Sequence, residues 1–227
     1  MAPTDLANHL GSIVLSVGAL GTAAFGLVDI AKFLPNGGIS NAGFAFIEAA
    51  VRQLLPDAAA ASMTLDNLHG NWINGRPLED QKAIAKSLLK LQLSPATANG
   101  FAAATQVDAA VLAGVAGNMT TGASLTPEQI NVLGRFDLTL TAMLDAGYQH
   151  ADQRYRNASK FLAMILAVLL ALFGGWAISS DTAGFFGSAE MWQVIVCGLL
   201  ATPLAPISKD LASALQAGVK VAQAVKG

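Results

Sequence analysis

The chain has 227 residues, of which 53% are hydrophobic and only 12% are charged. Its mean hydropathy of +0.50 is too high for an ordinary soluble domain of this length. The formal net charge of -2 offers no basic surface to a phosphate backbone, so we expect no nucleic-acid partner. The single cysteine, Cys197, excludes a disulfide or a thiolate metal site built within one chain.

Three strongly apolar segments, 10–28, 161–180 and 191–208, contain no Asp, Glu, Lys or Arg. Each is close to the roughly 20 residues that a helix needs to cross a hydrocarbon core. The first is rich in Gly and Ala, and we expect the third to end at Pro203 and Pro206. The pattern predicts an all-α integral membrane protein with transmembrane helices at 10–34, 159–180 and 191–207.

A fourth apolar stretch, 98–117, competes for the membrane. Its strongly apolar residues favour insertion by about as much as a central Asp108 disfavours it, and Asn99 and Gln106 tip the balance against insertion. We therefore expect no fourth span. Whether this stretch touches the membrane stays open.

The positions of Lys and Arg predict the orientation, because cytoplasmic loops beside membrane spans are enriched in them. All 13 lie between Lys32 and Lys160 or after Ser208. The tail 1–9 and the loop 181–190 contain none, so both are expected outside, with Trp176 and Trp192 at the outer interface. The expectation is a bacterial inner-membrane protein with a helical cytoplasmic domain at 35–158 and a cytoplasmic C-terminal helix at 208–227. A cleaved signal peptide is disfavoured, because residues 1–10 lack a positively charged n-region.

Two helices are predicted early in the cytoplasmic domain. Apolar residues recur at helical spacing from Phe44 to Leu55, and a second helix opens at Pro77. In the second helix we expect one face to carry Ile84, Leu88 and Leu91, and another to carry a lysine row. This row, Lys82, Lys86 and Lys90, is either the solvated back of a core helix or a contact for anionic lipid headgroups.

Two further helices should begin at Ser94–Pro95 and at Thr126–Pro127, which are N-cap and first-turn signatures. No proline follows Pro127 until after Ile178. We therefore predict one long helix that runs from the domain into the second span. Its last basic residues, Arg154, Arg156 and Lys160, are expected at the inner membrane interface.

No catalytic or metal site is predicted, and we expect neither a cofactor nor enzymatic activity. The three histidines, His9, His69 and His150, fall in separate segments. The stretch from Asp66 to His69 lacks a partner motif and is interpreted as a polar turn. No phosphate-binding or nucleophile-elbow motif is present in the sequence.

Small residues on the first span predict close helix packing. Gly18, Thr22 and Gly26 are four residues apart on one face, and Gly11 is a heptad before Gly18. This face packs either within the bundle or between subunits. On the C-terminal helix, a seam that includes Leu211, Leu215 and Val225 is expected to pack against another helix.

Three spans are too few to enclose a conduit, so we hypothesise a non-enzymatic, self-associating membrane protein that forms a homo-oligomeric pore or scaffold. A pore requires a polar membrane face, for which the side of Ser12, Ser16, Thr22 and Asp29 is the candidate. The alternative is a membrane-anchored adaptor whose helical domain binds a cytoplasmic protein partner. An adaptor requires an exposed apolar patch on the domain.

Overall fold

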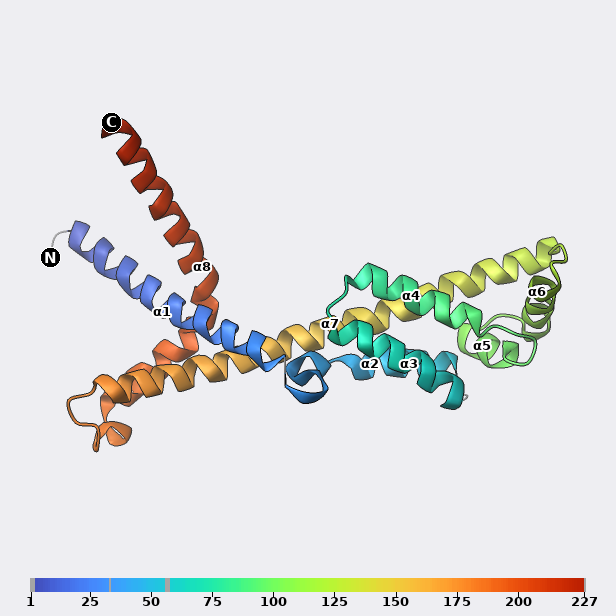
Figure 1. Cartoon of the computed structure of the whole chain (residues 1–227), viewed down its shortest axis with the longest axis horizontal. Helices are drawn as coiled ribbons and strands as arrows, with labels where there is room; N and C mark the ends of the chain where they lie inside the picture. Colours follow the sequence, from blue (N-terminus) through green and yellow to red (C-terminus); the bar gives the residue numbers. More distant parts are fainter. Residues whose placement is uncertain (1–2, 33, 56–57, 227) are drawn as a thin grey trace. The chain divides into compact units, whose positions relative to one another are not determined.

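The computed structural model describes the backbone of residues 3–32, 34–55 and 58–226; the side chains at 3–10, 35–36, 58–60, 215–216 and 218–226 lie outside the description. Every regular element within these residues is helical, which confirms the all-α class (Figure 1). In chain order they are α1 (Pro3–Ala31), η1 (Pro35–Asn41), α2 (Phe44–Leu54), α3 (Ala58–Ile73), α4 (Leu78–Leu91), α5 (Ala98–Thr105), α6 (Ala109–Thr121), α7 (Pro127–Ile178), η2 (Phe185–Gly187) and α8 (Ala189–Lys226).

The chain divides into two compact units. One consists of residues 1–35 and 157–227 and contains α1, the apolar part of α7 and α8. The other, residues 36–156, contains the helices from α2 to α6 and the first part of α7.

Three helices are long and apolar enough to cross a membrane, as the sequence predicts: Gly11–Ala31 of α1, α7, and Ala189–Ala214 of α8. In α7 the segment free of charged residues begins at Phe161. Phe161, Ile165, Leu169 and Phe173 are exposed at every fourth position along it. Large side chains on one outward face suit contact with lipid tails.

The three apolar helices meet through small residues. Ala24, Ala167 and Ala201, one from each of α1, α7 and α8, form a buried cluster. Gly21 of α1 lies directly against the carbonyl oxygen of Ala201, where a Cβ would overlap it. Small residues allow this close approach of helix backbones in a membrane.

The third apolar helix does not end at Pro203 and Pro206, because α8 continues through both prolines to Lys226; where the span itself ends remains a prediction. Proline removes a backbone donor and bends a helix without having to end it. In a membrane, neighbouring helices and side chains satisfy the carbonyls that are left unpaired. Figure 1 shows α8 changing direction along its length.

The 36–156 unit has its own apolar core around the first part of α7. α2 buries Phe44, Ile47, Val51 and Leu54, the face that the sequence predicts. Phe101 of α5 and Phe136 of α7 are fully buried and meet edge to face, with ring centroids 5.7 Å apart. Such a pair adds to the stabilisation from buried area alone.

A glycine sets the entry of α2 onto α7. Gly43 has φ 101°, a backbone conformation that side chains disfavour, and it also lies against the carbonyl oxygen of Ala151. Both the conformation and the close approach therefore require glycine at this position.

The starts of α4 and α7 agree with the sequence, but the start of α5 does not. At α7, the Thr126 hydroxyl accepts the Gln129 N–H at 3.3 Å, and the Gln129 side chain accepts the Thr126 N–H at 3.0 Å. This is a capping box. α5 begins at Ala98 instead of Ser94, because Ser94 and Thr97 bond each other in a turn that precedes the helix.

The stretch 98–117 is not one helix. It is interrupted after Thr105, where Gln106 adopts a left-handed conformation, and it resumes at Ala109. The Asp108 carboxylate caps the second helix by accepting the Val111 N–H at 2.9 Å. A capping role explains a charged residue in so apolar a stretch.

Candidate functional site

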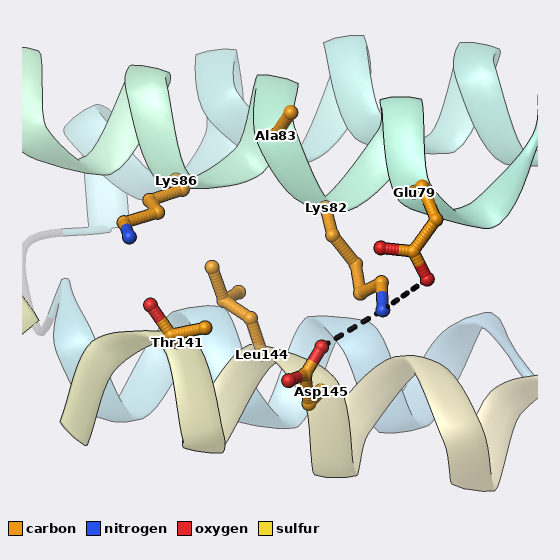
Figure 2. Close-up of a pocket in the computed structure, with 7 residues that line it drawn as sticks. All are labelled: Glu79, Lys82, Ala83, Lys86, Thr141, Leu144 and Asp145. Carbon is orange, nitrogen blue, oxygen red and sulfur yellow. Dashed lines mark ion pairs between the residues drawn. The ribbon is translucent and has the colours of Figure 1, made fainter. Parts of the chain in front are cut away.

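A row of ion pairs joins α4 and α7 in the 36–156 unit. Lys82 of α4 binds Asp145 of α7 at 2.9 Å and Glu79 of its own helix at 2.6 Å. Figure 2 shows the lysine ammonium between the two carboxylates. The pKa of the Lys82 ammonium is raised, mainly by its hydrogen bond to Glu79 and next by its hydrogen bond to Asp145, while desolvation acts in the opposite direction.

Asp137 of α7 forms the second half of the row. Its carboxylate binds Lys86 at 2.7 Å and also pairs with Lys90. Burial of Asp137 raises its pKa, but the hydrogen bonds and charges of the two lysines outweigh this and hold the pKa below its usual value. The side chains of Asp137 and Lys86 are 31% and 29% exposed, so water screens the pairs only in part.

The row corrects one of the two interpretations of the lysines. Lys82, Lys86 and Lys90 do not form an unpaired solvated face, because all three pair with carboxylates of α7; the Lys90 side chain is still 43% exposed, and contact of the row with lipid headgroups remains a prediction. The predicted apolar face of α4 is correct only in part: Ile84 and Leu88 pack against the core, but Ala85 and Leu89 are the fully buried residues and Leu91 is 80% exposed. Ala85 permits a closer approach of α4 to its neighbours than a larger side chain would.

A groove of about 250 Å³ follows the row, lined by Lys82, Lys86, Thr141 and Asp145 among others (Figure 2). The three lysines of the row are matched by three carboxylates, those of Glu79, Asp137 and Asp145. With balanced charge, the groove has no excess to attract a free anion or cation. The ion pairs along the groove instead hold α4 against α7.

The described histidines do not converge. His69 lies in α3, which corrects the predicted polar turn, and bonds the Asn41 side chain at 2.8 Å. His150 lies exposed on α7, near the Phe46 ring. The side chain of His9 lies outside the described residues. Within the described residues no group of three metal-ligating side chains forms.

The residues predicted at the membrane interfaces flank the apolar part of α7. Trp176 and Trp192 are exposed, and the Trp176 ring N–H donates to the Thr182 carbonyl at 3.2 Å. At the other end, Arg156 pairs with Asp152 at 2.8 Å, while Arg154 and Lys160 are exposed. Their contact with a membrane remains a prediction.

The small residues of α1 fall on two different faces. Gly18 packs on α8 against Ser208, but a Cβ on Gly11 or Gly26 would meet nothing within 4 Å. Thr22 is exposed, and its hydroxyl donates to the Gly18 carbonyl at 3.0 Å. The predicted four-residue set is therefore not brought together against one helix of the chain. Sequence reasoning missed Gly21, although its spacing of three from Gly18 and Ala24 marks the packed face.

Of the predicted seam on the C-terminal helix, only Leu211 is described as a side chain, and it is half-buried. The side chains of Leu215 and Val225 lie outside the described residues. The seam remains a prediction.

A second groove on the 36–156 unit, of about 430 Å³, has a largely apolar lining. It is lined by Leu93, Met119, Ile130 and Leu133, with Lys90 and Asp137 at its edge. Met119 and Ile130 are 60% and 56% exposed. Exposed apolar side chains gathered at a groove are typical of a surface that binds a partner.

Comparison with known proteins adds no relative. No family model matches the chain, and neither the curated proteins nor the solved structures searched contain a match.

Proposed function

We propose that the protein is a non-enzymatic integral membrane protein that self-associates through the outward face of α1 into a homo-oligomeric scaffold. The observation that carries the proposal is the character of this face. Ser12, Ser16, Ala19, Ala23 and Gly26 are all exposed at alternating spacings of four and three, and this face of small residues ends at the next position of the series, Ile30, which is 62% exposed. That spacing places them on one side of the helix, opposite Gly21 and Val28, which pack inward.

The outward face of α7 is different. It presents large side chains such as Phe161 and Phe173, which fill the space between lipid tails. A face of small residues contacts lipid less well but lets a second helix approach closely, and this close packing stabilises helix association in membranes. The contrast between the two faces supports an α1–α1 contact between copies of the chain.

The proposed orientation places the 36–156 unit in the cytoplasm and the residues before α1 outside, in a bacterial inner membrane. Lys32 follows α1, and Lys160 precedes the apolar part of α7, whereas the connection between α7 and α8 carries Asp181 and Glu190 and no basic residue. The bias of Lys and Arg toward cytoplasmic loops supports this orientation. The same distribution supports the predicted interface roles of Arg154 and Lys160.

Polar residues on and beside the outward face of α1 are compatible with a pore formed by the same oligomer. Ser12 and Ser16 lie on the proposed contact face, and Thr22 and Asp29 are exposed beside it. In an oligomer these groups could line a polar path between subunits. Conductance across a planar bilayer tests this version once a closed stoichiometry is established.

The experiment that tests self-association is native mass spectrometry of the purified chain released from nanodiscs. Gly26→Leu should disperse the oligomer, because its Cβ points into open space within one chain but into the proposed contact between chains. Gly174→Leu is the matched control, since Gly174 is equally open and lies on α7. A monomer in the wild type, or equal effects of the two substitutions, would refute the proposal.

The groove at Met119 and Ile130 favours a second function, that of a membrane-anchored adaptor for a cytoplasmic protein. In this case Met119→Ser with Ile130→Ser should abolish recovery of a cross-linked partner from cells and leave the oligomer unchanged. Gly26→Leu should instead disperse the oligomer and leave recovery of the partner unchanged. Recovery of the same partner with both variants would count against the groove.

A further inference from the structure

α8 runs in the opposite direction to α7 where the two helices touch. Val194 lies beside Gly175, and a Cβ on Gly198 would lie 2.7 Å from the Val168 Cα. Residue numbers therefore rise along α8 while they fall along α7.

α8 also runs in the opposite direction to α1 where those two helices touch. Gly21 meets Ala201 and Ala205, and Gly18 meets Leu204 and Ser208. Residue numbers again rise along α8 while they fall along its neighbour.

Under the proposed function, α1 and α7 cross the bilayer in opposite directions. α1 ends before the 36–156 unit and the apolar part of α7 begins after it, and within the described part of that unit α2 to α6 include no candidate span. A straight helix cannot run antiparallel to both of two neighbours that are themselves antiparallel to each other. We infer that α8 bends back inside the bilayer, so that the residues after Ser208 return toward the side on which α8 begins.

The sequence supplies the bend at the required place. Pro203 and Pro206 lie between the part of α8 that contacts α7 and the part that follows Ser208. Without their N–H groups, the carbonyls of Leu199 and Thr202 lose their helical donors, and the helix is free to bend. The 14 residues 189–202 rise only about 21 Å at 1.5 Å per residue, less than a hydrocarbon core of about 30 Å. In Figure 1 the last part of α8 and the first part of α1 extend in the same direction from the place where the two helices meet.

The basic residues after the bend favour a cytoplasmic end of α8 instead. Lys209, Lys220 and Lys226 would normally draw this segment to the cytoplasmic side. Ser208 packs beside Gly18, near the middle of the α1 span, so the neighbouring Lys209 lies at a depth where a charge is costly, and this cost also favours a cytoplasmic end of α8. The helix contacts and the charge rule thus predict opposite sides for the end of α8, which makes the inference testable.

The test uses the full chain with Cys197→Ala and one new cysteine at a time. Ala217→Cys reports on the end of α8, Thr182→Cys on the connection between α7 and α8, and Ser87→Cys on α4; all three native side chains are exposed. Spheroplasts are treated with a membrane-impermeant maleimide before or after permeabilisation. We expect Ala217→Cys to react before permeabilisation, as Thr182→Cys does, and Ser87→Cys to react only afterwards.

Reaction of Ala217→Cys only after permeabilisation would overturn the inference and leave the proposed function intact. Reaction of Thr182→Cys and Ser87→Cys from the same side would instead refute the crossing of α7, on which both depend. Adding Pro203→Ala and Pro206→Ala to the Ala217→Cys chain should move its reactivity to the permeabilised sample. Unchanged reactivity would show that the prolines do not cause the return.

Discussion

Replacing Asp137 by Asn should weaken the attachment of α4 to α7 by about 1–2 kcal/mol. The carboxylate binds two lysines of α4, so the substitution removes both charge-assisted bonds at once. Exposed pairs contribute up to about 1 kcal/mol and broken buried pairs cost about 3–5 kcal/mol. Asp137 lies between these limits, because its side chain is 31% exposed and the released lysines can turn to water.

Hydrogen exchange followed by mass spectrometry measures this loss directly in the full chain in nanodiscs. A loss of 1–2 kcal/mol in local stability corresponds to about 5- to 30-fold faster exchange. We expect this acceleration in peptides from α4 and not in peptides from α8. Asp66→Asn is the control, because Asp66 is an exposed acid on α3 outside the row. Unchanged exchange of α4 in Asp137→Asn, or equal acceleration in Asp66→Asn, would refute a fastening role for the row.

Three further predictions concern stability of the full chain. The pKa of Lys82 is raised in the folded state, so its contribution to stability is complete below about pH 10.4 and is lost as the pH rises through the folded pKa. The difference in melting temperature between wild type and Lys82→Met should therefore shrink from about pH 9 to about pH 11.5. Gly21→Ala should lower thermal stability in detergent by about 1–3 kcal/mol because its Cβ would overlap the Ala201 carbonyl, whereas Gly26→Ala should be tolerated; equal melting temperatures would contradict the packing of α1 on α8. Phe136→Ala should cost about 3–5 kcal/mol, measured by urea unfolding of the 36–156 unit within the full chain through Trp72 fluorescence, with Trp176 and Trp192 replaced by Phe; a loss under 1 kcal/mol would contradict its place in the core.

Local signals in the sequence were sufficient for the starts of α4 and α7 and for the membrane-length segments. Pro77 and the Thr126–Gln129 pair act within one turn, so their effect is readable from neighbouring residues. The apolar segments are similarly readable, because a bilayer requires length and composition that few other structures need. These are the features on which sequence and structure agree.

Features that depend on distant residues could not be read in the same way. The partner of Lys86 is 51 residues away, so its charge could be interpreted only as free. The buried face of α4 contains Ala85 because of a close neighbour, and an alanine gives no hydrophobic signal that distinguishes it from an exposed one. Proline at 203 is an ordinary helix terminator in water, and only the surrounding helices allow α8 to continue past it.

The contact of Gly18 and Gly21 with Ala201 and Ser208 joins segments about 180 positions apart in the chain. Because α1 precedes α8 in the chain, α1 is synthesised and enters the membrane before this partner exists. Long-range contacts of this kind are slow to form, whereas the contiguous 36–156 unit has its helices available earlier. The face of α1 that carries Gly18 and Gly21 is thus uncovered until α8 has been synthesised, and its packing on α8 forms later than the helix contacts of the 36–156 unit.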